Sequence, residues 1–195
     1  RADLHQFVGY MPEHDCLPND QTAADLVATF GELAGLPAEA ARQRASDMLD
    51  LVGLDEARFR PVGGFSTGMR QRTKLAQALV ADPELVLLDE PTAGLDPMGR
   101  EEMLDLVGRL STFGVSVLFA THLLDDVQRV CDHVVMIDAG KLVVAGPIQD
   151  LVQRTGILRV EACGLCGTDH EQWTGALHPG WAFVPGHEVV GVIEE

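Results

Sequence analysis

A short apolar run that ends in two acids constrains this chain most. Residues 85–88 read Leu-Val-Leu-Leu, which is too short for a helix and suits a strand that is buried on both faces. Asp89 and Glu90 follow at the carboxyl end of this strand, where open α/β sheets place their ligands. One carboxylate can hold a hydrated Mg²⁺ while its neighbour polarises a water for attack on a phosphate. The run therefore predicts an α/β fold with phosphate chemistry at this edge of the sheet.

A helix start precedes this strand. Ser66 is a natural N-cap, and Gly68 lets the backbone approach a ligand closely. The first amides of such a helix have no partner within the helix, so they favour an anion such as phosphate. A cap or an acid pair alone is more often structural. The ordered combination of cap, helix, strand, acid pair and the Gly-Leu-Asp loop at 94–96 favours a functional interpretation.

These residues resemble the nucleotide-binding subunit of ABC transporters. The run Phe65–Met69 is similar to the L-S-G-G-Q signature, with Thr67 in place of the first glycine and Met69 in place of the glutamine. Both departures are tolerable, because the signature acts mainly through its serine and backbone amides. The acid pair at 89–90 resembles the Walker B pair, and Ala93–Asp96 resembles the D-loop.

Two further positions fit the same family. Glu13, after a predicted strand at 4–10, takes the place of the Q-loop glutamine, although a solvated turn acid is an equal alternative. His122 follows a predicted strand at 115–120. A lone histidine there is most often structural, but its position matches the switch histidine that contacts the γ-phosphate.

The resemblance implies a role for each of these residues. Asp89 would hold Mg²⁺, and Glu90 and His122 would be catalytic. The residues expected to bind ATP or its metal are Glu13, Ser66, Thr67, Gly68, Asp89 and Asp96. The implied function is the ATP-binding and ATP-hydrolysing subunit of a transporter, with an exporter favoured. Its implied partners are a membrane-spanning subunit and a second nucleotide-binding subunit.

Apolar periodicity predicts the remaining elements. Helices at 22–34 and 37–52, punctuated by Gly35 and Gly53, fit the family's helical insert at about 20–80, whose surface would dock the membrane-spanning subunit. A helix with a proline start is predicted at 97–110. The other predicted elements are helices at 123–131 and 148–154 and strands at 134–138 and 141–145.

Composition limits the possible partners and the cellular location of the protein. The net charge of −16 argues against nucleic acid as a partner over a broad surface. No apolar run is long enough to span a membrane, and no signal peptide opens the sequence. Four cysteines, with Cys16 and Cys131 far apart, do not form the pattern of a secreted disulfide scaffold. These features favour a reducing cytosol, and the resemblance to the ABC nucleotide-binding subunit implies a cytoplasmic protein that is peripheral on the cytoplasmic face of the cell membrane.

One motif of the family does not occur in the sequence. The P-loop pattern G-x-x-x-x-G-K-[ST] is absent, and the pair Gly140-Lys141 is followed by Leu142. In the family this loop precedes the Q-loop, so it would lie before Arg1. The expectation is an ABC ATPase domain of the P-loop NTPase-like α/β class at 1–155, truncated at its amino end and inactive as written.

The chain changes character near Gly156. Cys166 and His187 lie on separate predicted turns, with Glu188 beside the histidine, and could be zinc ligands with a supporting acid. Unligated buried cysteines are an equal alternative on spacing alone, and a short zinc knuckle lacks a second C-x-x-C. The predicted strands of this region are at 157–162 and 189–193.

This tail resembles a second family. The segment V-E-A-C-G-L-C-G-T-D at 160–169 and P-G-H-E at 185–188 are similar to the GroES-like catalytic domain of zinc-dependent alcohol dehydrogenases. The resemblance makes Cys166 and His187 zinc ligands, Glu188 the adjacent acid and Thr168 the proton relay, whereas Cys163 matches a position that is not a ligand. The family's third ligand would lie beyond Glu195. We expect a small β-rich fragment at 156–195 with at most weak zinc binding.

Three interpretations remain open. The first is an ABC ATPase fragment, favoured by the longer and more specific motif set. The second is a zinc-dependent, NAD(P)-linked dehydrogenase fragment with an unrelated leader. The third is a binding or structural protein, a non-catalytic chimeric product, that kept the fold but lost catalysis. The favoured origin is a truncated fusion, a recombined gene or a misassembled reading frame, because a natural bifunctional enzyme would keep both sites whole.

Overall fold

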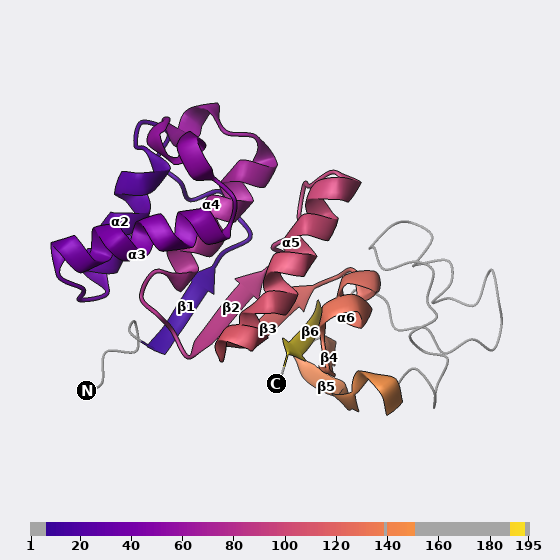
Figure 1. Ribbon diagram of the computed structural model, residues 1–195. Helices are drawn as coiled ribbons and strands as arrows, with labels where there is room; N and C mark the ends of the chain where they lie inside the picture. Colours follow the sequence, from indigo (N-terminus) through magenta and orange to yellow (C-terminus); the bar gives the residue numbers. More distant parts are fainter. Residues whose placement is uncertain (1–6, 139, 151–187, 194–195) are drawn as a thin grey trace. The chain divides into compact units, whose positions relative to one another are not determined.

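The computed structural model describes residues 7–138, 140–150 and 188–193 (Figure 1). The chain divides into two compact units, of which the first comprises the described residues up to Leu118 and the second those from Phe119 onward. The two units are described separately below.

The first unit contains parallel strands. Strand β1 (Val8–Met11) pairs in parallel with β2 (Leu85–Asp89), so that Val8 lies opposite Leu85 (Figure 1). Strand β3 (Ser116–Thr121), which begins in this unit, is next in the strand order. The predicted β2 is confirmed, but full burial on both faces is wrong. Val86 and Leu88 are buried, whereas the alternate residues of the strand are only half-buried.

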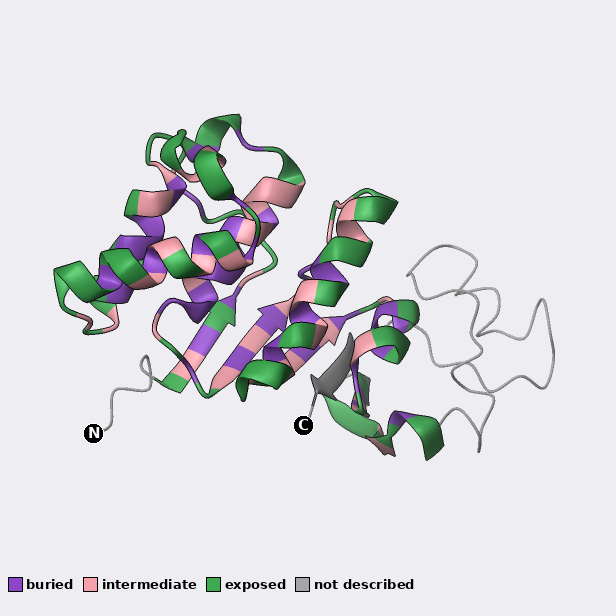
Figure 2. Ribbon diagram, in the orientation of Figure 1, coloured by how far each residue is buried: buried purple, intermediate pink, exposed green. Residues whose placement is uncertain are grey.

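Helices supply the rest of the first unit. The predicted helices are confirmed as α2 (Ala23–Leu33), α3 (Ala38–Leu51), α4 (Thr67–Leu79) and α5 (Pro97–Leu110). Short 3₁₀ turns occur at Asp55–Phe59, Val62–Gly64 and Ser111–Phe113. Helix α3 contacts α2 and α4, and α4 contacts β1. Buried and exposed bands alternate along these helices, as expected for amphipathic elements around one core (Figure 2).

Local sequence explains where these helices begin. The Thr22 and Ser66 side chains accept from the amides of Asp25 and Met69, so each satisfies one of the free amides at its helix start. Helix α3 starts after Pro37, which has no side-chain cap. Glycines end the first two helices of the insert, because the backbone turns left-handed at Gly35 (φ +100°) and Gly53 (φ +72°).

The second unit combines a short helix with an antiparallel sheet. Helix α6 (Leu124–Val130) precedes strand β4 (His133–Asp138), which pairs with both β5 (Lys141–Pro147) and β6 (Glu188–Ile193). These elements confirm the predicted helix at 123–131 and the strands at 134–138, 141–145 and 189–193. The predicted helix at 148–154 is helical over 148–150, and its remainder lies outside the described residues, as does the predicted strand at 157–162. Among the described helices, none has the length and apolar character to cross a membrane.

Candidate functional site

A pocket of about 490 Å³ lies in the first unit, beside the start of α4. One wall is the turn Ser66–Met69, and another is the loop Gly94–Asp96. Arg72 and Glu102 also line the pocket. The signature-like run and the D-loop-like run of the sequence therefore meet at one cavity.

The signature-like turn offers backbone amides to this cavity. The Ser66 hydroxyl accepts from the Met69 amide at 3.3 Å, and Ser66 and Thr67 are exposed. A Cβ added at Gly68 would find its nearest atom, Cδ2 of Leu95, at an ordinary 3.7 Å. Packing within the chain therefore leaves room at Gly68 for a group outside the protein. The helix start and this room suit an anionic oxygen.

The D-loop-like segment is held against the same turn. Gly94 has φ +72°, a conformation that favours glycine, and a Cβ there would stand 3.2 Å from Cγ2 of Thr67. The buried Gln71 donates from Nε2 to the Ala93 carbonyl at 3.0 Å. The Asp96 carboxylate accepts from the Gly99 amide at 3.1 Å and so caps α5. Its predicted role in nucleotide binding therefore accompanies a structural role.

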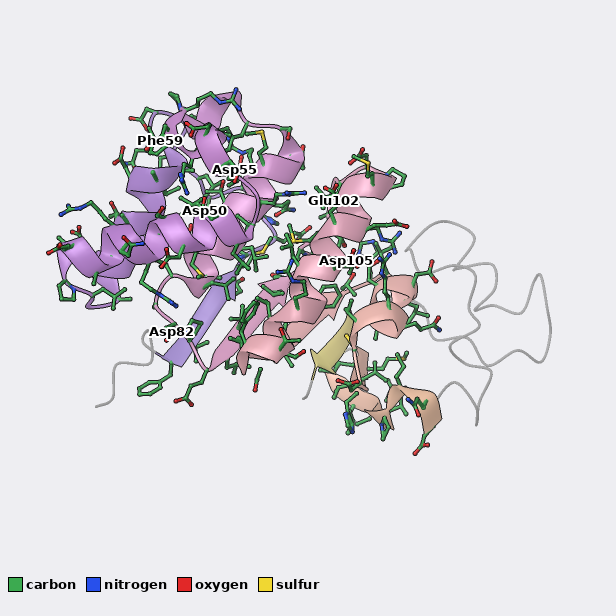
Figure 3. The ribbon with its side chains drawn as sticks, in the orientation of Figure 1. Asp50, Asp55, Phe59, Asp82, Glu102 and Asp105 are labelled. Atoms are coloured by element: carbon green, nitrogen blue, oxygen red, sulfur yellow. The ribbon has the colours of Figure 1, made fainter. Side chains whose placement is uncertain are left out.

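An ion pair between Arg72 and Glu102 also lines the pocket. Glu102 projects from α5 toward α4, where Nη2 of Arg72 donates to its carboxylate (Figure 3). Nη1 of Arg72 donates to the Val52 carbonyl, at the end of α3, at 3.0 Å. One guanidinium therefore joins α4 to both the end of α3 and α5.

The predicted magnesium ligand Asp89 and the predicted catalytic acid Glu90 lie at the end of β2. Oδ2 of Asp89 accepts from the Tyr10 hydroxyl at 3.4 Å, across the parallel β1–β2 pair. Partial burial and the Asp89 carboxylate raise the pKa of Tyr10, so it remains a donor. Glu90 adopts φ +46°, an uncommon conformation for a residue other than glycine and one that recurs at functional sites. These half-buried carboxylates are hard oxygen donors of the type that Mg²⁺ prefers.

Glu13 and His122 are less closely tied to this arrangement. The Glu13 carboxylate is exposed and lies 3.6 Å from His14, between Oε2 and Nδ1. His122 follows β3 in the second unit and is exposed. Their predicted roles in metal and phosphate binding stay predictions.

The predicted zinc ligands fall outside the part of the chain that the structure describes. Cys166 and His187 belong to residues 151–187, and Glu188 is described only as a backbone position of β6. Among the described residues, no group of three or more His, Cys, Asp or Glu side chains could hold a metal ion.

Sequence reasoning missed the polar side chains of α4 after its first turn. Gln71 and Arg72 bond Ala93 and Val52, whereas Arg70 and Lys74 both bond the loop at 12–21, and Gln71 and Lys74 are buried. One signal was present, since Lys74 stands next to Leu75 and Ala76 on the predicted helix. The partners of these side chains lie far along the chain, so the signal did not identify them.

Comparison with known proteins agrees with the predicted families. Residues 1–93 match the family model described as "ABC transporter", and residues 153–195 match the "Alcohol dehydrogenase GroES-like domain". The resemblance to ABC ATP-binding subunits is confirmed. The mixed α/β fold with its parallel strands is typical of the ABC ATPase domain.

Curated ABC relatives extend the match further along the chain. An uncharacterized ABC transporter ATP-binding protein of Bacillus subtilis (strain 168) is 40% identical over 149 residues, which is 76% of this chain and 50% of the relative. A linearmycin resistance ATP-binding protein of the same organism is 34% identical, over 80% of this chain and 50% of the relative. The Nod factor export ATP-binding protein I of Ralstonia nicotianae is 34% identical, over 74% and 45%. The chain thus spans about half the length of the curated relatives that it matches.

Proposed function

We propose that residues 1–155 are part of the ATP-binding subunit of an ABC transporter, and that their pocket receives the terminal phosphate of a nucleotide held by a second such subunit. The pocket between Ser66–Met69 and Gly94–Asp96 carries this proposal, because it combines free amides at a helix start with open space at Gly68. The names of two relatives, which concern linearmycin resistance and Nod factor export, support an exporter.

The acid pair supplies the second half of the proposed chemistry. Asp89 would hold Mg²⁺, which neutralises charge on the phosphate oxygens when it is bound. Glu90 would orient the attacking water, and its left-handed backbone sets the direction in which the side chain leaves the strand end. Tyr10 donates to Oδ2 of Asp89 and so restrains the carboxylate. His122 would contact the γ-phosphate, and Glu13 would approach the metal.

The proposed setting follows from the same family. The helical insert at about 20–80 would dock a membrane-spanning subunit, and the protein would sit on the cytoplasmic face of the membrane. The working unit would be a dimer of nucleotide-binding subunits, with no nucleic acid partner. The net charge of −16 disfavours a nucleic acid partner. It does not disfavour nucleotide binding, because backbone amides and a metal hold the phosphates locally.

Ser66 offers a matched test of the pocket. Asparagine and aspartate both cap helices well and are nearly the same size, but only aspartate adds a negative charge. The two variants are made in a longer protein in which a P-loop-bearing segment precedes residue 1, with Glu90→Gln to trap a two-nucleotide dimer. We expect Ser66→Asp to abolish Mg-ATP-dependent dimerisation and Ser66→Asn to retain much of it, as measured by size-exclusion chromatography with light scattering.

A control separates the site from general charge effects. Ser116, an exposed residue at the start of β3, receives the same aspartate, and this variant should dimerise normally. If Ser66→Asp and Ser66→Asn dimerise equally well, the pocket does not receive a phosphate. Because Asp89 is proposed to hold the metal and Glu90 to orient the water, Asp89→Asn should weaken Mg²⁺-dependent binding and Glu90→Gln should leave nucleotide binding intact.

The dehydrogenase interpretation rests on the match at 153–195. We propose that this segment is a piece of a zinc-dependent alcohol dehydrogenase domain joined to the ABC-like part. The assignments of Cys166, His187, Glu188 and Thr168 belong to this second candidate function. Alcohol-dependent NAD(P) reduction that is lost in Cys166→Ser would favour it over the ATPase interpretation.

A further inference from the structure

The loop at 12–21, between β1 and α2, lies against α4. Lys74 donates from Nζ to the carbonyls of Pro12 and Glu13, at 2.7 and 2.9 Å. Lys74 is only 3% exposed, and such burial is rare for a lysine unless its ammonium is paired. A buried ammonium with two carbonyl partners loses much of its stabilisation if these carbonyls move away.

Arg70, one helical turn before Lys74, binds the next part of the same loop. Its Nη2 lies 2.6 Å from Oδ2 of Asp15 and donates to the Leu17 carbonyl at 3.3 Å. Its Nη1 donates to Oδ1 of Asn19 at 3.1 Å and to the Val62 carbonyl at 2.8 Å. The guanidinium fork thus contacts the loop and the segment that leads into the signature-like turn.

The two cations therefore attach the loop to α4 at several points along its length. Arg70 itself lies in the first turn of the helix that Ser66 caps, and its amide donates to the Ser66 carbonyl at 2.9 Å. A displacement of the loop must either break these charge-assisted bonds or carry the start of α4 with it.

We propose that Lys74 and Arg70 couple the loop at 12–21 to the signature-like turn, so that the two segments move as one body. Lys74 and Arg70 are positioning residues in this device, and Asp15 is the contact through which the loop engages it. A displacement of Glu13 is then transmitted to Ser66 through contacts within the chain. This coupling goes beyond the proposed phosphate pocket and does not depend on it.

The acylation rate of Lys74 can report whether the loop covers it, because the chain has two lysines, Lys74 and Lys141, and the second serves as the reference. Lys141 is exposed, whereas Lys74 is buried. Burial lowers the pKa of Lys74, which favours the reactive neutral amine, so slow acylation of Lys74 must come from the loop that covers it. We expect N-hydroxysuccinimide acetate to modify Lys141 at least tenfold faster than Lys74 in the intact chain, as measured by peptide mass spectrometry.

The coupling is tested by a change at the loop surface. Asp15→Asn removes the charge opposite Arg70, and we expect it to raise Lys74 acylation about threefold or more relative to Lys141. It should also accelerate amide hydrogen exchange in peptides that cover residues 66–72. Asp20→Asn, an exposed acid of the same loop, is the matched control and should change neither rate.

The outcomes distinguish coupling from local loosening. Faster exchange that is confined to 12–21 in Asp15→Asn, with 66–72 unchanged, would overturn the proposal. Equal effects of Asp15→Asn and Asp20→Asn would overturn it as well. Lys74→Met should accelerate exchange in both segments, and if this variant fails to fold, Asp15→Asn remains decisive because its side chain is largely exposed.

Discussion

Gly9 and Ala78 approach each other so closely that a Cβ on residue 9 would stand 2.0 Å from the Ala78 carbonyl oxygen. Gly9 lies in β1 and Ala78 in α4, and both groups at this contact are backbone. At this point the helix that carries the signature-like turn therefore contacts the sheet backbone to backbone.

Gly9→Ala should destabilise the first unit. The added methyl group would meet rigid backbone, so strand and helix would have to separate, at a cost of about 1–3 kcal/mol or more. Gly64→Ala is the matched control, because a Cβ at Gly64 meets nothing within 4 Å. Urea unfolding followed by circular dichroism measures both changes. Equal unfolding midpoints for the two variants would contradict the close contact.

Arg72→Met should cost more stability than Glu102→Gln. Glu102→Gln weakens a half-exposed ion pair, which is typically worth about 0–1 kcal/mol. Arg72→Met also leaves the Val52 carbonyl without its donor, which adds about 1–3 kcal/mol. High salt should reduce the effect of Glu102→Gln more than that of Arg72→Met. The reverse order of the two free-energy changes would show that the bond to Val52 contributes little.

Cys131 should make the second unit sensitive to alkali. Burial raises the pKa of its thiol from 9.0 to about 12, so the unfolded chain ionises first as the pH rises. The contribution of the neutral thiol is fully present below pH 9 and is lost toward pH 12, at about 1.4 kcal/mol per pH unit. In Cys131→Ala the free energy of unfolding should fall less steeply over this range. Parallel pH profiles for parent and variant would refute this.

A polypeptide of these 195 residues should not release phosphate from Mg-ATP at a measurable rate. Its sequence contains no P-loop, so the triphosphate lacks an amide cradle and a lysine, while Asp89 and Glu90 repel it. The signature-like turn would serve a nucleotide held elsewhere. Steady-state phosphate release at millimolar Mg-ATP is the measurement. Turnover that disappears in Glu90→Gln would disprove the prediction.

Residues 156–195 should not form a working catalytic zinc site. Such a site needs three protein ligands and an open position, whereas the dehydrogenase match supplies Cys166 and His187. Cys163, His170 and His178 could support weak binding. Metal analysis of protein purified without added zinc should find much less than one zinc per chain. One zinc that survives dialysis and is lost in Cys166→Ser would reverse this conclusion.

Local signals predicted most of the fold in the described chain. Ser66 and Pro97 mark helix starts through short-range chemistry, and Gly53 ends a helix because it adopts a left-handed backbone, so each is visible in a few neighbouring residues. The burial of β2 was overestimated, because an apolar run does not reveal which of its faces is covered.

The site was predictable only in part, for a physical reason. The signature-like and D-loop-like runs are compact motifs that the sequence reveals, and the structure adds that both line one pocket. The Arg72–Glu102 pair and the loop contacts of Lys74 join residues far apart in sequence, and a single sequence carries no record of such pairings. The place of His122 relative to Asp89 also depends on tertiary arrangement, so it stays a prediction.

The lining of the pocket has a consequence for the history of the gene. All lining residues fall between Gly53 and Met103, so one short coding segment encodes the whole cavity. The dehydrogenase-like match begins only at residue 153. A recombination event near that junction would replace the coding sequence downstream of it and leave every residue that lines the pocket unchanged. Chimeric genes can therefore inherit this pocket intact, even when the rest of the gene encodes unrelated chemistry.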